Sequence, residues 1–154
     1  MKKGWFALSQ TEGDEIEPEI IPEWDQNLAI RNLEIEIVPF DLVDGNVQGY
    51  SIGRKVAISP IAQIPIKTLF HEMGHVLLGH TDLNPHDETL PRSPKEVEAE
   101  SVAYLCLSAL GLKGGEYCRG YIQGWIKTES IPEKSAQKIM NVADKILKAG
   151  RGVK

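Results

Sequence analysis

Residues 66–80 read Ile-Lys-Thr-Leu-Phe-His-Glu-Met-Gly-His-Val-Leu-Leu-Gly-His. Apolar side chains occupy nearly every other position, which predicts a buried helix over about residues 65–79. His71 and His75 are four residues apart, so they lie on one helix face and can direct ring nitrogens at a single ion, with Glu72 beside it. Imidazole and carboxylate groups on a buried helix are costly unless they are paired or bind a metal. The stretch therefore indicates the metal site of a metal-dependent hydrolase.

A metal held by two histidines needs a third protein ligand, and a hydrolytic site usually keeps the fourth position for water. In one arrangement, a glycine ends the helix three residues after the second histidine, and a third histidine follows three residues later. This chain has Leu78 and Thr81 at those positions, and Gly79 and His80 are each one residue out of register. His80 is more simply a helix C-terminal residue, where an imidazole meets the negative end of the helix dipole, although ligation by His80 stays open.

A second helix is predicted over residues 94–110. Ser93 is suited to its N-cap and Pro94 to its first turn, and Gly111 ends it. At this helix start, Glu96 has a purely structural alternative, which is a capping box closed with the backbone of Ser93.

The same helix offers the missing ligand. Glu96 and Glu100 lie one turn apart on one stripe, and the small side chains of Ala99 and Ala103 would let this helix approach the first one closely. That approach places Glu96 as the third metal ligand and Glu100 as a partner of a ligating histidine. Spacing alone favours a ligand role and a capping-box role for Glu96 about equally, and Glu98 is a further ligand option.

The rest of the chain predicts an α+β domain in which a small sheet packs on the histidine-bearing helix. Residues 11–27 are rich in Glu, Asp and Pro and indicate an acidic linker. The other predicted elements are a short helix near 24–32, strands over 34–38, 46–52 and 54–59 with a tight turn at Gly53, and two C-terminal helices over about 115–127 and 132–149.

Composition agrees with one enzyme-sized domain. The chain has 154 residues, 42% of them hydrophobic, which is enough for one sizeable core. A net charge of -5 argues against DNA binding by this chain alone, because binding to a phosphate backbone needs clustered Lys and Arg. Two cysteines are too few for a disulfide framework, and Cys106 is expected to be inert packing. With no apolar segment long enough for a signal peptide or membrane span, a cytoplasmic protein without membrane contact is expected.

The chain contains three notable segments, Lys67-Thr-Leu-Phe-His-Glu-Met-Gly-His-Val-Leu-Leu-Gly-His-Thr81, Glu96-Val-Glu-Ala-Glu-Ser-Val-Ala103 and Tyr121-Ile-Gln-Gly-Trp125. Together they resemble the C-terminal metallopeptidase domain of the ArdC antirestriction proteins, a minimal zincin related to the ImmA/IrrE-type peptidases. They keep the same order and spacing over about residues 50–150. Residues 5–13, Trp-Phe-Ala-Leu-Ser-Gln-Thr-Glu-Gly, are similar to the strand and turn that close the ArdC single-stranded-DNA-binding domain, most of which is absent here.

The resemblance implies a gluzincin-like fold with an N-terminal arm over residues 1–27 and a zincin-like metallopeptidase domain over residues 28–154. It implies one zinc ion per chain and assigns Glu96 as the third ligand, with Glu98 as a neighbour. The implied function is hydrolysis of a protein or peptide substrate, linked to antirestriction or to mobile-element and phage biology. Two alternatives stay open: a catalytically weak metal-containing module that binds a protein, and a regulator-cleaving peptidase of the ImmA type.

In zincin-like folds an extended substrate adds to the edge strand that precedes the metal-binding helix. The expected residues of that strand are Val56, Ala57, Ile58 and Ser59. A position in the sheet core is an alternative for the same residues, because alternate side chains face opposite ways. Glu72 is expected to act as the general base, taking a proton from the attacking water and delivering it to the departing amine. The group that stabilises the oxyanion stays open among Tyr50, Tyr104, Tyr117, Tyr121 and His80.

Overall fold

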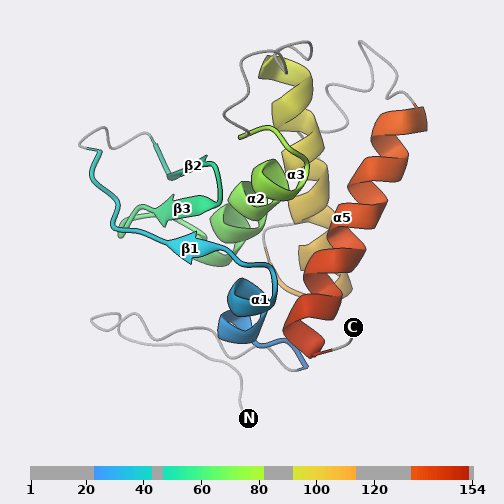
Figure 1. Ribbon diagram of the computed structural model, residues 1–154, viewed down its shortest axis with the longest axis horizontal. Helices are drawn as coiled ribbons and strands as arrows, with labels where there is room; N and C mark the ends of the chain where they lie inside the picture. Colours follow the sequence, from blue (N-terminus) through green and yellow to red (C-terminus); the bar gives the residue numbers. More distant parts are fainter. Residues whose placement is uncertain (1–22, 43–46, 82–91, 114–132, 153–154) are drawn as a thin grey trace.

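A computed structural model describes residues 23–42, 47–81, 92–113 and 133–152 (Figure 1). Within these ranges the chain forms four helices and a three-stranded mixed sheet, which confirms the predicted α+β class. The predicted helix at 115–127 lies outside the described residues. The elements are α1 (Gln26–Asn32), β1 (Glu36–Ile37), β2 (Gly49–Ile52), β3 (Lys55–Ile58), α2 (Pro65–Leu77), α3 (Arg92–Ala109) and α5 (Glu133–Arg151).

The sheet has the order β1-β3-β2, with β3 parallel to β1 and antiparallel to β2. A two-residue turn, Gly53-Arg54, joins β2 to β3, and Gly53 has a φ of 57°. A hairpin turn with positive φ at its first residue favours glycine, because a Cβ is strained there. The turn is hydrogen-bonded to the segment that follows α2, because Thr81 Oγ1 donates to the Gly53 carbonyl at 2.6 Å. The hairpin therefore lies beside the histidine-bearing helix.

The expectation that residues 56–59 form the edge strand is wrong. Val56, Ala57 and Ile58 belong to β3, which is paired on both sides, and Val56 and Ala57 are completely buried. Ser59 follows the strand, is also buried, and donates its N–H to the Gln48 carbonyl at 2.8 Å. The resemblance to zincin-like folds suggested an edge because β3 is the strand that precedes α2, but the parallel pairing with β1 occupies its second side. The edge strand next to α2 is β2.

The first strand is shorter than predicted because of how α1 ends. Glu34 adopts a left-handed conformation with φ of 56°, and the Ile35 N–H donates to the Ile30 carbonyl at 3.0 Å. This is the usual hydrogen bonding of a helix that ends on a left-handed residue. The chain can extend only after this turn, so β1 begins at Glu36 and not at residue 34.

The boundary predicted between residues 27 and 28 falls inside α1, and the core begins before it. Trp24 is 4% exposed, its Nε1 donates to the Ile146 carbonyl at 3.1 Å, and its ring meets Phe70 edge-on at 5.1 Å. A Cβ on Gly150 would lie 2.2 Å from Trp24 Nε1, so only glycine lets α5 approach this ring. Residues 1–22, including most of the predicted linker and the ArdC-like segment, lie outside the described ranges.

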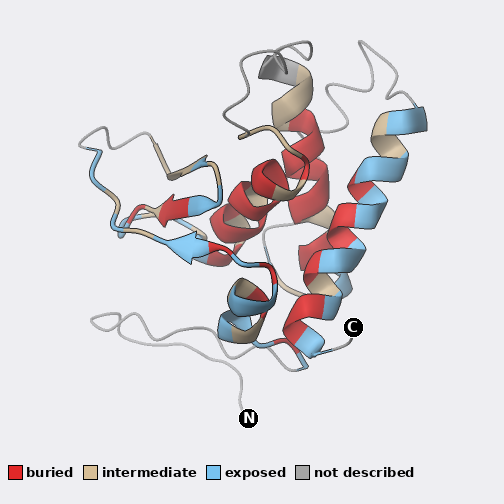
Figure 2. Ribbon diagram, viewed as in Figure 1, coloured by how far each residue is buried: buried red, intermediate tan, exposed pale blue. Residues whose placement is uncertain are grey.

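Helix α2 contacts the sheet on one side and α3 on the other, and it is largely buried (Figures 1 and 2). A Cβ on Gly74 would lie 3.4 Å from Ala99 Cα, and Ala99 and Ala103 are completely buried. The predicted close approach of the two helices is thus confirmed, and small residues on both sides allow it. None of the helices in the described part of the chain is long and apolar enough to cross a membrane.

The last helix, α5, covers α1 and α3 with one apolar stripe (Figure 2). Its buried residues include Ile139, Val142, Ala143 and Ile146, at the three- and four-residue spacing of a helix face that packs on a core. Cys106 of α3 packs beneath this helix, with its thiol 3.8 Å from the Ala143 carbonyl. Burial raises the pKa of this thiol to about 12, so Cys106 is inert packing, as expected.

Candidate metal centre

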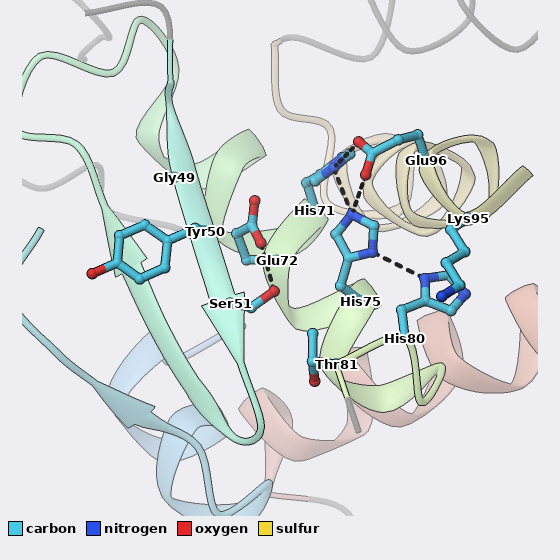
Figure 3. A pocket seen from close by; sticks show the side chains of 10 residues that line it. All are labelled: Gly49, Tyr50, Ser51, His71, Glu72, His75, His80, Thr81, Lys95 and Glu96. Atoms are coloured by element: carbon cyan, nitrogen blue, oxygen red, sulfur yellow. Dashed lines mark hydrogen bonds and ion pairs between the residues drawn. The ribbon is translucent and has the colours of Figure 1, made fainter. Parts of the chain in front are cut away.

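Three side chains from two helices converge on one point (Figure 3). His71 and His75 project from successive turns of α2, and their Nε2 atoms are 3.1 Å apart. The Glu96 carboxylate reaches across from α3, with one oxygen 3.1 Å from His71 Nε2 and the other 2.9 Å from His75 Nε2. Ligand atoms about 2.0–2.2 Å from a tetrahedral zinc ion are about 3.3 Å from one another. These three residues form a group that could hold a metal ion.

The packing of α3 decides between the alternatives for Glu96 and Glu98. The helix begins at Arg92, so Ser93 lies inside it and not at its N-cap, and both Glu96 oxygens contact histidines. Glu98 is two residues further on, a rotation of about 200° around the helix axis, and faces away from the three converging atoms. Its oxygens contact His80 Nε2 at 2.7 Å and Ser135 Oγ at 2.6 Å.

His80 is not one of the three converging residues. Its Nδ1 lies 2.9 Å from Nδ1 of His75, on the opposite side of that ring from Glu96 (Figure 3). Burial opposes ionisation of Glu98, but the hydrogen bonds from His80 and Ser135 outweigh it and hold the pKa of Glu98 below its usual value. Glu98 is therefore a carboxylate, and it is the partner of His80.

The structure also brings Glu100 to the position expected of a histidine partner. Its Oε1 is 2.6 Å from Nδ1 of His71, the ring nitrogen that does not face Glu96, and 3.4 Å from Lys67 Nζ. A carboxylate at this nitrogen orients the imidazole and keeps its other nitrogen available to a metal. Because Glu96 and Glu100 are one helical turn apart, each ring nitrogen of His71 has its own carboxylate partner.

These contacts shift the ionisation of the site in the absence of a metal. Burial of His71 opposes its positive charge, but hydrogen bonds to Glu100 and Glu96 outweigh burial and raise the pKa of His71 to about 9. Hydrogen bonds from His71 and then His75 hold the pKa of Glu96 far below its usual range. A proton on His71 consequently competes with any metal ion for the same nitrogen.

We expect zinc affinity to rise about tenfold per pH unit between about pH 7 and 9, because each ion displaces one proton from His71. Because the pKa of His71 is raised, its protonated form stabilises the metal-free fold. This stabilisation is complete below pH 6.5, the ordinary pKa of histidine, and is lost as pH rises through about 9. Chelator competition across this pH range measures the affinity. Glu100→Gln removes one of the carboxylates that raise the pKa of His71. The zinc affinity of this variant should therefore stop rising at a lower pH than that of the wild type. An affinity that does not change with pH would contradict the competition.

A pocket of about 560 Å³ opens over the converging residues. Its walls come from residues 49–51 of the edge strand β2, from α2 through Glu72, and from α3 through Lys95. The candidate ligands therefore face a space that can admit another molecule.

Glu72 lies at this pocket and is held by a residue that sequence reasoning missed. Ser51 Oγ donates to Glu72 Oε1 at 2.7 Å. The strand comes this close because Gly49 has no side chain; a Cβ there would lie 2.7 Å from Thr68 Cγ2 and 2.8 Å from the Ala57 carbonyl. Gly49 and Ser51 lie on the same face of β2, because alternate residues of a strand point the same way. This alternation is the feature of the sequence that could have indicated a role for Ser51.

Two of the open oxyanion candidates line the pocket but direct their polar atoms elsewhere. The Tyr50 hydroxyl points away from Glu72 and donates to Asp41 Oδ1 at 2.7 Å, and this hydrogen bond raises the pKa of Tyr50 (Figure 3). Both ring nitrogens of His80 are engaged by His75 and Glu98. Tyr104 packs against the hydrophobic core. Tyr117 and Tyr121 lie outside the described residues.

Together these features define an α+β protein with a three-residue candidate metal centre at a pocket. No protein-family model, characterised protein or solved structure matches the chain.

Proposed function

We propose that this chain is a zinc-dependent metallopeptidase of the minimal zincin type, with Glu72 as its general base. The observation that supports this most directly is the convergence of His71, His75 and Glu96 next to Glu72 at one pocket. A structural zinc site usually closes with four protein ligands and needs no base, whereas three ligands beside a carboxylate suit catalysis. This difference favours an enzyme over a metal-containing module that only binds a partner.

The donor set suits one zinc ion per chain, because imidazole nitrogens and a carboxylate oxygen are common zinc ligands, although manganese or cobalt can replace zinc in a preparation. His71, His75 and Glu96 would hold this ion, and it would supply Lewis-acid chemistry that polarises the substrate carbonyl and activates the attacking water. Glu72 takes the proton of the attacking water and delivers it to the departing amine. Ser51 occupies one Glu72 oxygen and leaves the other for this transfer.

The proposed substrate is a protein or peptide that binds in an extended form along β2. The two-residue turn makes Ile52 and Lys55 a hydrogen-bonded pair, and Tyr50 and Ala57 form the next hydrogen-bonded pair. The main-chain groups of Gly49 and Ser51 then face away from β3. In the described part of the chain no strand covers that side of β2. A peptide can therefore pair there and place its carbonyl beside the metal centre.

The resemblance to the ArdC proteins supports a link to antirestriction, or more broadly to mobile-element or phage biology. A peptidase that cleaves a regulator, as in the ImmA proteins, would use the same chemistry on a different target. Cytoplasmic location and the lack of DNA binding by this chain alone stay predictions.

The proposal is tested by comparing new protein amino termini in a host-cell lysate treated with the zinc-loaded wild type or with the zinc-loaded Glu72→Gln variant. Cleavages present only with the wild type would support a peptidase and reveal its sequence preference. If the two samples show no difference while zinc is confirmed at one per chain, the protein-binding module becomes the better account.

A further inference from the structure

A line of hydrogen-bonding groups leads from His75 to the last helix of the fold. Nδ1 of His75 is 2.9 Å from Nδ1 of His80, His80 Nε2 is 2.7 Å from Glu98 Oε1, and Ser135 Oγ is 2.6 Å from Glu98 Oε2. We call His80, Glu98 and Ser135 the His80 chain. Its members come from the turn after α2, from α3 and from α5, so three separate parts of the sequence meet at this line.

The two central members are deeply buried. The side chain of His80 is 6% exposed and that of Glu98 is 4% exposed. A carboxylate and an imidazole removed from water to this extent are costly unless each has partners. Both groups therefore depend on the contacts of the His80 chain, and neither is a solvated surface residue.

The backbone fixes where His80 lies. Helix α2 ends in a turn in which Gly79 has a φ of 82° and its N–H donates to the Val76 carbonyl at 3.2 Å. The His80 N–H donates to the His75 carbonyl at 2.9 Å. These two bonds form a Schellman motif, which turns the chain back on the helix end and carries the His80 ring against His75.

Only one placement of protons satisfies the line when both imidazoles are neutral. The Glu98 carboxylate can only accept, so the Ser135 hydroxyl and His80 Nε2–H both donate to it. Nδ1 of His80 then carries a lone pair and accepts from Nδ1–H of His75. This placement leaves the lone pair of His75 on Nε2, the atom that faces His71 and Glu96. It therefore describes the metal-bound site, in which a metal ion takes the place of the proton that His75 Nε2 donates to Glu96 in the metal-free protein.

We propose that the His80 chain is a positioning device that holds His75 in the tautomer and orientation that bind the metal, and that it couples this ligand to α5. The inference rests on the proposed function, because it assumes a metal centre at these residues. Glu100 contacts Nδ1 of His71 directly. Glu98 supports Nδ1 of His75 in the same way, but through the imidazole of His80. The two metal ligands are therefore oriented by independent groups.

The test compares two double variants, His80→Ala/Glu98→Gln and His80→Asn/Glu98→Gln. Both remove the buried charge of Glu98, but only Asn keeps an oxygen near the position of His80 Nδ1 that can accept from His75. We expect the Ala variant to bind zinc about 10–100-fold more weakly than the wild type, and the Asn variant to recover most of that loss. Chelator competition at one pH gives the affinities, and the absorption spectrum of the cobalt-loaded protein reports the ligand geometry.

A role limited to stabilising the fold predicts a different result, in which both double variants lose metal affinity and melting temperature equally. Melting of the metal-free proteins separates stability from metal affinity, and the exposed substitution Glu133→Gln in the first turn of α5 controls for a general effect of that helix. The inference is overturned if Asn and Ala bind zinc equally weakly, or if the Ala variant binds like the wild type.

Ser135→Ala provides a second measurement in case the double variants do not fold. It keeps His80 and Glu98 but removes one donor, and we expect zinc affinity to fall by about two- to fivefold, less than for loss of a direct histidine partner. An unchanged affinity in this variant would overturn the coupling to α5. If the wild type binds no zinc, the proposed function itself is overturned. If the wild type binds zinc and the variants bind it equally well, only the inference is overturned.

Discussion

Glu72→Gln is expected to lower the rate of peptide hydrolysis by about 10²–10⁴-fold, or about 3–5 kcal/mol, while zinc stays bound at one per chain. Glutamine has nearly the shape of glutamate but cannot take a proton from water. Glu72 is not among the three converging residues, so its neutralisation leaves the ligands in place. Turnover of a cleavable peptide found in the lysate comparison, with zinc content measured on the same samples, checks both parts.

Ser51→Ala is the matched control for this substitution. It keeps the Glu72 carboxylate and removes only the hydroxyl that donates to it. Its rate should fall by less than that of Glu72→Gln, because the base is still present but is less firmly oriented. Hydrolysis at the wild-type rate by the Glu72→Gln variant would eliminate Glu72 as the base.

Glu96→Ala is expected to weaken zinc binding by more than about 100-fold, beyond the effect of losing a group that only orients a ligand. The substitution removes one of three donors and the negative charge that lies within 3.1 Å of both histidines. Without this charge, two imidazoles remain to bind a divalent cation. Chelator competition, or calorimetric titration of the metal-free protein with zinc, measures the loss.

Lys95→Ala is the control for Glu96→Ala, because Lys95 lies next in sequence and lines the same pocket but has no ligand atom in the group. Its zinc affinity should stay close to that of the wild type. If Glu96→Ala also keeps the wild-type affinity, the third ligand must be sought elsewhere, and the proposed centre would have to be redrawn.

Much of the helical scaffold was predictable from local pattern. The ends observed for α2, α3 and α5 lie within two residues of the predicted ones, because apolar spacing together with Pro and Gly signals marks such elements. The strands were less accurate. Nothing in the local sequence announces that Glu34 adopts a left-handed conformation, and this turn delays the start of β1. Nor does the local sequence reveal that β3 pairs on both sides, so the edge strand expected from the resemblance was misplaced.

The candidate site was also predictable only in part. The four-residue spacing of His71 and His75 places both on one face of any helix, whatever packs against it. Glu96 and Glu98 were both open as ligands because either face of α3 could have met α2. The structure gives that contact to the face with Ala99 and Ala103, which turns Glu96 and Glu100 toward His71 and sends Glu98 to His80.

The sequence by itself determined the α+β class, the histidine-bearing helix and the pairing of His71 and His75 with Glu72, because each depends on residues within a turn or two of one another. Tertiary structure decided what depends on contacts between distant segments. Ser51 reaches Glu72 across 21 positions of sequence, and Ser135 reaches Glu98 across 37. Such contacts form only when the strand and helices pack, since neither a helical nor a strand period relates residues so far apart.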